Sequence, residues 1–316
     1  MANSILHIGD SPAGVPQGLS RAQRKIGLKS DILNFLQYKF EFEVDFHWPR
    51  RESSSLKPLR YIEALVNATT LLKISKDYNV FHFHYRSALP GYLDLPIWKG
   101  QKKKIIVHHH GSDLRHRGEP RFCSKFADKI LISTPDLLDW SPEAVWVPNP
   151  ISLENFQFIG VAEKDKSEKV TIAHASANRQ IKGTDYIIKA VKELKKENYR
   201  INLLLIENMP HRKALECYKQ ADIVVDQLGI GWYGVFALEC MAMGKPVCAY
   251  IRRDLKSLLP SSVLINASPK DITENLRILI EDWKLRRDFG ERGRKFVQEF
   301  HDASKVVQTV NRLYND

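Results

Sequence analysis

Residues 221–251 combine a strand, a short glycine-containing loop and a helix that carries a single acid. Residues 223–225 form a β-branched run of the kind found in parallel strands that are buried on both faces. A loop follows, and Gly234 then opens a helix whose apolar positions are interrupted by Glu239. Because the N–H groups at a helix N-terminus attract anions, this segment is our first candidate for the binding site of a negatively charged ligand.

Three consecutive histidines end a predicted strand at residues 105–109 and precede a turn. Side chains alternate along a strand, so His108 and His110 share one face. Three clustered imidazoles suggest a metal site, but no acid stands at ligand spacing beside them. A structural hydrogen-bonding role is therefore the alternative for His108 and His109, and Asp113 either orients His110 or caps a helix.

Gly14 and Gly18 punctuate the loop between the first predicted strand and the first predicted helix. Glycines let a ligand approach the backbone closely, and the helix that follows adds partial positive charge. The two glycines are thus candidates for an acceptor or phosphate loop. Their spacing differs from the G-x-G-x-x-G of dinucleotide-binding proteins, which disfavours a dehydrogenase.

The composition favours a globular chain with two hydrophobic cores. Its 316 residues are 43% apolar and 27% charged, which suits two domains of ordinary size. No run approaches the roughly 20 apolar residues of a membrane-spanning helix, and we expect no secretion leader. The four cysteines have no C-x-x-C spacing, so a reducing, cytoplasmic compartment is expected instead of a disulfide framework.

The net charge of +11 predicts an anionic partner. Charge alone leaves nucleic acid, a lipid headgroup surface and a phosphorylated substrate open. Nucleic acid is not expected, because no helix-turn-helix, zinc pair or RNA-binding aromatic signature accompanies the charge. The segment 45–60 mixes Phe46 and Trp48 with several cations, which suits either a membrane interface or an ordinary surface loop.

Short apolar strands alternate with helical patterns along both halves of the chain, as in parallel sheets with crossover helices. In the first half, strands are predicted at residues 5–8, 31–35, 80–85, 105–109, 129–132 and 145–147, with helices at 17–26 and 61–73. In the second half, strands are predicted at 170–174, 202–206, 223–226, 247–250 and 263–265, with a helix at 184–196.

We therefore expect an α/β protein with two doubly wound, Rossmann-like domains that face each other across a cleft. The first domain covers residues 1–150 and would bind the acceptor, and the second covers residues 168–290. Residues 291–316 have the pattern of a broken amphipathic helix. Ligands of such sheets bind beyond the carboxyl ends of the strands, so a site between the domains is expected.

Residues 231–246 resemble the donor-sugar motif of the retaining, B-type-fold (GT-B) glycosyltransferases of family four. That motif is Glu-x7-Glu with an alanine-glycine-proline ending, and the ending here is MAMGKPV. The resemblance implies that Glu239 holds the ribose hydroxyls of a nucleotide sugar. Gly231 replaces the first glutamate, and Tyr233, Gly234 and Val235 complete the implied donor-binding loop.

The resemblance extends over nearly the whole chain and implies further site residues. In the family, an arginine and a lysine after the first strand of the second domain neutralise the donor diphosphate, and Arg179 and Lys182 match them with a shortened spacing. The alternative is a solvated charge pair at a helix start. His110 matches the histidine that lies beside the transferred sugar. The catalytic set implied is therefore His110, Arg179 and Lys182.

The resemblance implies transfer of a hexose-type sugar from a UDP- or GDP-linked donor to a glycan or lipid-linked acceptor. It also implies retention of configuration, with neither metal nor cofactor, and a C-terminal helix that braces the first domain. We expect the acceptor to belong to the cell envelope and the chain to be cytoplasmic, with peripheral contact to the inner, anionic membrane face as one alternative.

Two other readings stay open at this point. A catalytically inactive nucleotide- or glycan-binding subunit of the same fold is an alternative because Gly231 replaces a motif glutamate. An epimerase or a phosphorylase-like reaction would also suit the fold, although a short chain without an evident cofactor lysine argues against the phosphorylase.

Overall fold

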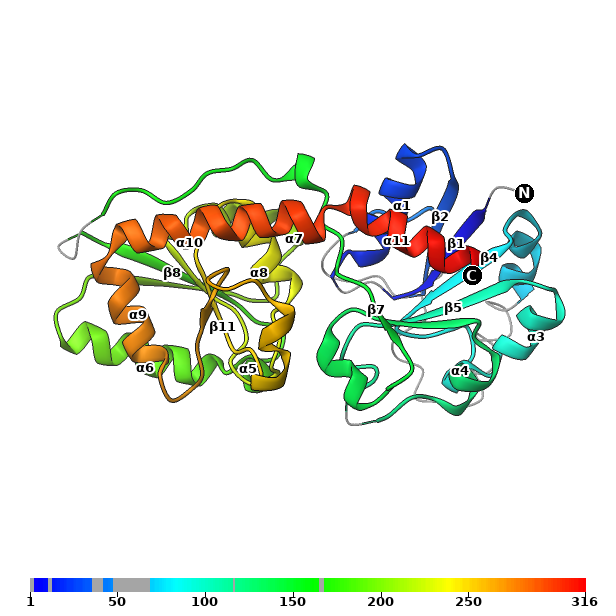
Figure 1. The fold of residues 1–316 in the computed structure, drawn as a ribbon, viewed down its shortest axis with the longest axis horizontal. Coiled ribbons are helices and arrows are strands. Elements are labelled where there is room, and N and C mark those ends of the chain that lie inside the picture. The colour runs from blue at the N-terminus through cyan, green and yellow to red at the C-terminus, as the bar shows by residue number, and fades with distance from the viewer. Residues whose placement is uncertain (1–2, 11–12, 36–41, 48–68, 116, 165–167) are drawn as a thin grey trace. The chain divides into compact units, whose positions relative to one another are not determined.

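The computed structural model describes residues 3–10, 13–35, 42–47, 69–115, 117–164 and 168–316. The chain divides into two compact units, each of which contains one parallel sheet with helices packed on it (Figure 1). Unit 1 comprises Met1–Pro150 together with Ala303–Asp316, and unit 2 comprises Ile151–Asp302. The chain therefore passes from one unit to the other twice.

Unit 1 contains a sheet of seven parallel strands in the order β3-β2-β1-β4-β5-β6-β7. The order reverses between β1 and β4, which makes the carboxyl ends of these strands a topological switch point. The strands are β1 (Ser4–Gly9), β2 (Lys29–Asn34), β3 (Phe46–His47), β4 (Val80–His84), β5 (Lys104–His109), β6 (Lys129–Ile132) and β7 (Val145–Trp146).

The two faces of the first sheet differ in chemistry because side chains alternate along each strand. One face carries apolar side chains such as Phe81 and Phe83, which belong to a hydrophobic core with Trp98. The other face carries His82 and His84, which are buried yet polar. The helices that pack on unit 1 include α1 (Val15–Lys25), α3 (Leu95–Gly100), α4 (Arg121–Phe126) and α11 (Ala303–Asn315).

Unit 2 contains a sheet of five parallel strands in the order β12-β11-β10-β8-β9. Its order reverses between β8 and β10, so this unit also has a switch point. The strands are β8 (Val170–Ala175), β9 (Ile201–Ile206), β10 (Ile223–Val225), β11 (Val247–Ala249) and β12 (Ile265–Asn266). The helices are α5 (Arg179–Lys182), α6 (Thr184–Lys196), α7 (His211–Lys219), α8 (Val235–Ala242), α9 (Ile272–Glu281) and α10 (Trp283–Phe296).

The C-terminal segment changes unit at a break in its helix. Helix α10 continues into a π-helical turn at Val297–His301 and stops before α11 begins at Ala303. Helix α11 packs against α1 in unit 1, where Ala22, Ala303 and Val307 form a small buried cluster (Figure 1). The residues before the break, including 291–302 of the predicted helix, belong to unit 2.

The predicted strands all have counterparts in the structure, with ends that differ by one or two residues. The two-residue edge strand β3 was missed because it is too short to show a periodic pattern. The predicted helix at 61–73 lies mostly outside the described residues, as does the aromatic and basic segment from Trp48 to Arg60. In the part of the chain that is described, none of the helices has the length and apolar character needed to span a bilayer.

Candidate functional site

Lys182 lies just beyond the carboxyl end of β8, at the end of the short helix α5. Its Nζ donates hydrogen bonds to Asp226 Oδ1 (2.6 Å) and to Gln227 Oε1 (2.9 Å). Asp226 and Gln227 directly follow β10. These contacts therefore span the switch point of the second sheet, where ligands of doubly wound domains bind.

Asp226 also contacts the N-terminus of helix α8. Its Oδ2 accepts a hydrogen bond from the Gly234 N–H at 2.6 Å, and the acid is fully buried. One carboxylate thus holds both the ammonium of Lys182 and an N–H at the helix N-terminus, the two groups expected to meet a phosphate. An ammonium has three N–H donors, and its two partners in the described part of the chain leave one donor for a ligand.

Arg179 lies one helical turn before Lys182 and forms an ion pair with Glu207. The guanidinium donates from Nε and from one terminal nitrogen to the two carboxylate oxygens, at 2.8 Å each. Glu207 follows β9, so a third strand contributes to the same sheet edge. The Arg179 side chain is 53% exposed, and an ion pair at such an exposed position contributes little to stability.

Glu239 lies in the middle of α8, where it is 7% exposed. Its Oε1 lies 2.7 Å from Nε2 of His211, the first residue of α7. Burial by itself would lower the pKa of His211, but the hydrogen bond and negative charge of Glu239 raise this pKa above its usual value. The pair can offer a charged imidazole and a carboxylate to a polar ligand.

The loop before α8 has a shape that suits glycine at position 231. Gly231 has φ 98°, and a Cβ there would lie 3.0 Å from Arg252 Cβ. Only glycine adopts such a backbone at little cost. A glutamate at this position, as in the resembled motif, would require the loop to change. The backbone conformation at position 231 therefore favours the glycine that replaces the first motif glutamate.

Tyr233 points into the interior of unit 2. It is 2% exposed, and its hydroxyl lies 2.9 Å from His301 Nε2. Its ring stacks on Trp232, with centroids 4.8 Å apart. A ligand of this loop can therefore contact only the main chain of Tyr233. Gly234 and Val235 form the entry to α8, with Gly234 at the N-cap.

In unit 1, His110 follows β5 with both ring nitrogens engaged. Nε2 lies 2.9 Å from His84 Nδ1, and Nδ1 lies 2.6 Å from Ser133 Oγ. Asp113 accepts hydrogen bonds from the main-chain N–H groups of His110 and Gly111. Its other oxygen lies 2.9 Å from Nδ1 of His109. The prediction that Asp113 either orients the His110 ring or caps a helix is corrected: this acid braces the turn after β5.

Within the described ranges, two groups of three histidines lie close enough together to be candidate metal sites. They are His7 with His82 and His84, and His84 with His108 and His110, and each group can bring three nitrogens within 4.8 Å of one another. Tetrahedral zinc with Zn–N distances of about 2.0–2.1 Å would hold its nitrogens roughly 3.3 Å apart. The facing nitrogens of His7 and His84, and of His84 and His110, are 2.9 Å apart. This geometry fits hydrogen bonds between rings.

The two glycines predicted for the N-terminal loop differ in position. Gly14 is the N-cap of α1 and has φ 71°, so it shapes the entry to this helix. Gly18 lies inside α1, where a Cβ would meet Pro150 at 3.1 Å. The placement of Gly18 in the loop was wrong, since this residue lies in the first turn of α1 and already fell within the predicted helix at 17–26. Its lack of a side chain allows α1 to pack closely on Pro150.

Several polar residues at these sheet edges were not predicted from the sequence. In unit 2 they are Asp226, Glu207 and His211, which pair with the three predicted residues described above. In unit 1, Asp10 and Arg86 form an ion pair beyond the ends of β1 and β4. For Asp226 and Glu207 a signal was present, because Asp226 ends one predicted strand and Glu207 directly follows another. Arg86 likewise directly follows the predicted strand at 80–85, whereas His211 had no comparable signal.

Comparisons with known proteins agree with this architecture. No known family model matches the chain. The chain is 26% identical over 304 residues to an uncharacterized glycosyltransferase of Methanocaldococcus jannaschii, with 83% of each chain covered. It is similar to the structure of sucrose-phosphate synthase from Thermosynechococcus elongatus, with 15% identity and a TM-score of 0.70 over 99% of this chain and 98% of that one.

A second similar structure is an alpha-glucosyltransferase in complex with UDP. It has 13% identity and a TM-score of 0.66, and each chain is fully covered. These similarities, together with the two parallel sheets and alternating helices, show that the chain has the α/β fold of GT-B glycosyltransferases.

Proposed function

We propose that the protein is a glycosyltransferase that takes a sugar from a nucleotide-sugar donor. The observation that carries the proposal is the group formed by Lys182, Asp226 and the Gly234 N–H at the switch point of the second sheet. A lysine and a helix N-terminus are groups that bind diphosphates. The similarity to a glycosyltransferase over most of the chain supports the same activity.

The donor diphosphate would bind at the carboxyl edge of unit 2. Arg179 would release Glu207 and clamp the phosphate oxygens, while the third N–H of Lys182 adds a further donor. The first turn of α8 supplies main-chain N–H groups. Glu239 would accept hydrogen bonds from the ribose hydroxyls, with His211 holding the carboxylate in place.

The reaction breaks the bond between the anomeric carbon and a phosphate oxygen, and a new bond forms between that carbon and an acceptor oxygen. Positive charge grows on the sugar while negative charge grows on the leaving diphosphate, so cations at the diphosphate lower the barrier. We propose that configuration is retained and that the leaving phosphate takes the proton of the acceptor hydroxyl. The sequence contains no Asp-x-Asp pair that would call for a bridging divalent metal.

The acceptor side belongs to unit 1 in this proposal, with His110 beside the transferred hexose. The acceptor would be a glycan or a lipid-linked glycan of the cell envelope, reached from the cytoplasm at the inner membrane face. The basic net charge supports peripheral contact with an anionic surface. The aromatic and basic segment considered for this contact lies mostly outside the described residues.

The proposal is tested by titrating the purified chain with UDP, GDP and ADP and following heat release and melting temperature. One nucleotide is expected to bind, and Glu239→Gln is expected to weaken it about tenfold or more because the ribose loses a charged acceptor. Glu193→Gln, in helix α6, is the matched control and should bind like the wild type. Failure of all three nucleotides to bind would contradict the donor site.

Sugar release from the matching nucleotide sugar separates an enzyme from an inactive subunit of the same fold. Binding of the nucleotide together with sugar release supports the transferase. Binding without release from any UDP-, GDP- or ADP-linked sugar, with or without candidate acceptors, would favour the binding subunit.

A further inference from the structure

A chain of hydrogen bonds runs through the interior of unit 1 from Gln23 to His110. His7 Nε2 lies 2.8 Å from Gln23 Oε1, and His7 Nδ1 lies 2.9 Å from His84 Nε2. His84 Nδ1 in turn lies 2.9 Å from His110 Nε2, and His110 Nδ1 lies 2.6 Å from Ser133 Oγ. Three imidazole rings thus connect an amide on α1 with the turn after β5.

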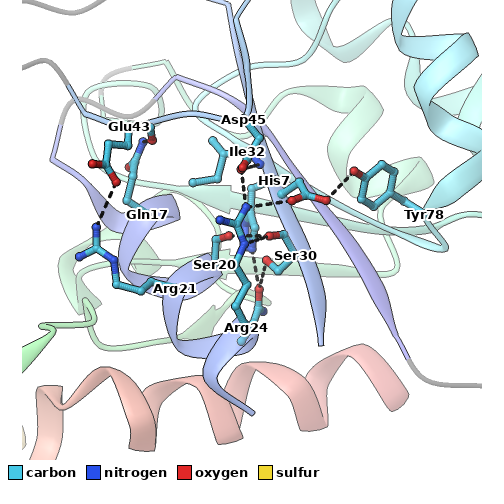
Figure 2. A network of polar contacts seen from close by, with 12 residues as sticks. His7, Gln17, Ser20, Arg21, Arg24, Ser30, Ile32, Glu43, Asp45 and Tyr78 are labelled. Atoms are coloured by element: carbon cyan, nitrogen blue, oxygen red, sulfur yellow. Dashed lines mark hydrogen bonds and ion pairs between the residues drawn. The ribbon is translucent and has the colours of Figure 1, made fainter. Parts of the chain in front are cut away.

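Both the oxygen and the nitrogen of the Gln23 side-chain amide are held by hydrogen bonds. Its Oε1 also accepts a hydrogen bond from Ser30 Oγ at 2.7 Å, and its Nε2 donates to Tyr314 Oη at 3.1 Å and to Asn311 Oδ1 at 3.4 Å. Figure 2 shows His7, Ser20, Ser30 and Arg24 gathered around this part of α1. Gln23 itself is fully buried. Its partners come from β1, β2 and α11, so the amide is held by the fold and not by solvent.

Burial keeps the three histidines that link Gln23 to Ser133, namely His7, His84 and His110, neutral at physiological pH. Burial lowers the pKa of His7 to about 4 and that of His110 to about 4, and it lowers the pKa of His84 well below its usual value. A neutral imidazole has one N–H donor and one nitrogen acceptor. Each ring can therefore donate a hydrogen bond to only one of its two neighbours. The tautomer of the first ring thus determines the tautomer of the next ring.

The direction of the whole chain follows from the amide oxygen. Gln23 Oε1 can only accept, so His7 carries its proton on Nε2 and accepts at Nδ1. His84 must then donate from Nε2 and accept at Nδ1, and His110 must donate from Nε2. The unprotonated Nδ1 of His110 then accepts a hydrogen bond from the hydroxyl of Ser133. A half-turn of the Gln23 amide would reverse each of these bonds.

We propose that Gln23 is a positioning residue that sets the Nε2–H tautomer and the ring orientation of His110 through His7 and His84. His110 touches no group of Gln23 directly, so the effect passes through two buried rings. The consequence for turnover rests on the proposed function, in which His110 lies beside the transferred sugar. The tautomers themselves do not depend on that function.

The direct test is two-dimensional NMR of the imidazole nitrogens in the full-length, ¹⁵N-labelled protein near neutral pH. Long-range nitrogen–proton correlations identify which ring nitrogen carries the proton. We expect Nε2–H at His7, His84 and His110. An Nδ1–H tautomer at His110, or a rapid mixture of both forms, would overturn the proposal without any variant being made.

The variant Gln23→Met keeps the size of the side chain but removes the amide oxygen. His110 is expected to populate both neutral tautomers in this variant. Its two ring-nitrogen signals should therefore move towards intermediate chemical shifts. Asn311→Ala is the matched control, because Gln23 keeps its bond to Tyr314 and its oxygen still faces His7. Wild-type His110 signals in Gln23→Met would contradict the proposal. If Gln23→Met does not fold, the wild-type tautomers still decide the question.

Kinetics then test the role in turnover. Gln23→Met is expected to lower kcat about tenfold to a hundredfold, because small losses of alignment near a reacting centre have effects of this size. The dissociation constant of the nucleotide should stay unchanged, since the nucleotide binds to unit 2. An altered His110 tautomer with unchanged kcat would overturn the positioning role. If the wild type turns over no nucleotide sugar, the proposed function fails and the role in turnover fails with it, while the tautomer result remains.

Discussion

Asp226 holds Lys182 through a 2.6 Å bond between Oδ1 and Nζ, at the place where a donor diphosphate is proposed to bind. The acid is fully buried, while the lysine side chain is 20% exposed. Without a ligand, the positive charge of Lys182 is thus already neutralised. The acid positions the lysine, and at the same time it weakens the attraction of the lysine for a phosphate.

Asp226→Asn is expected to increase the affinity for a nucleoside diphosphate several-fold, because it removes a negative charge beside the proposed phosphate site. The same change should lower the free energy of unfolding by about 1–3 kcal/mol, since Lys182 and the Gly234 N–H lose a charged acceptor. Calorimetric titration and urea denaturation measure the two effects. Weaker binding together with lower stability would mean that Asp226 positions the lysine more than it competes with the ligand.

Arg179→Gln is expected to leave the melting temperature unchanged, because its pair with Glu207 lies at the surface. Nucleoside diphosphate binding should nevertheless fall at least tenfold if the guanidinium clamps the diphosphate. Arg277→Gln provides a control, since Arg277 forms a similar surface pair with Glu197 elsewhere in unit 2. Equal nucleotide binding by the Arg179 and Arg277 variants would remove Arg179 from the site.

The pair of His211 and Glu239 predicts a pH dependence of stability. The hydrogen bond and charge of Glu239 overcome the opposing effect of burial and raise the pKa of His211 above 6.5. A raised pKa means that the pair stabilises the fold fully below the unfolded pKa and loses this contribution as pH rises through the folded value. The stability advantage of wild type over His211→Gln should therefore shrink as the pH rises from the unfolded pKa of about 6.5 through the higher folded value.

Chemical denaturation at several pH values measures this difference. The control is Glu239→Gln, in which the histidine loses its charged partner and the pH dependence should become weaker. A stability difference that grows with rising pH would contradict the account of this pair.

Gly231→Ala is expected to lower the free energy of unfolding by about 1–2 kcal/mol, because the residue has φ 98° and its Cβ would press on Arg252. Gly229→Ala is the matched control in the same loop. Its Cβ would meet the Ile181 carbonyl oxygen at 3.6 Å, an ordinary contact, and its φ is not in the left-handed region. Equal stability of the two variants would mean that the loop adapts to a side chain at position 231.

The fold could be predicted largely from the sequence because buried parallel strands leave a clear signal. Runs such as residues 223–225 and 129–132 are short, β-branched and bounded by turns, and the structure has strands there. The helix at 184–196 was also predicted with its observed bounds, since its apolar residues recur on one face. The edge strand β3 has only two residues and gives no periodic pattern.

The candidate site could be predicted only in part. Glu239 stood out as the single acid of an apolar helix, and Lys182 stood out through its match to the diphosphate-binding lysine of the resembled family. Their partners Asp226 and His211 come from other parts of the sequence and meet them only when the strands are ordered in the sheet. The inward direction of Tyr233 was also not predictable, because it depends on the position of His301 after the long helix α10.

The buried histidines show a further limit of sequence reasoning. Alternation along a strand predicted that His108 and His110 share a face, but it could not show which histidines of other strands lie beside them. The register between β1 and β4 brings His7 level with His82 and leads to the contact with His84. This contact depends on how the strands pair in three dimensions, because His7 and His84 are 77 residues apart in the sequence.

The central claim is that the chain transfers sugar from a nucleotide sugar, and the most direct measurement is release of labelled sugar from UDP-, GDP- and ADP-linked hexoses. Purified wild type, Glu239→Gln and Lys182→Met are compared at equal concentration, with and without glycan acceptors. We expect release or transfer from one donor by the wild type, reduced at least a hundredfold in both variants. Wild-type protein that binds none of these donors and releases no sugar would contradict the claim.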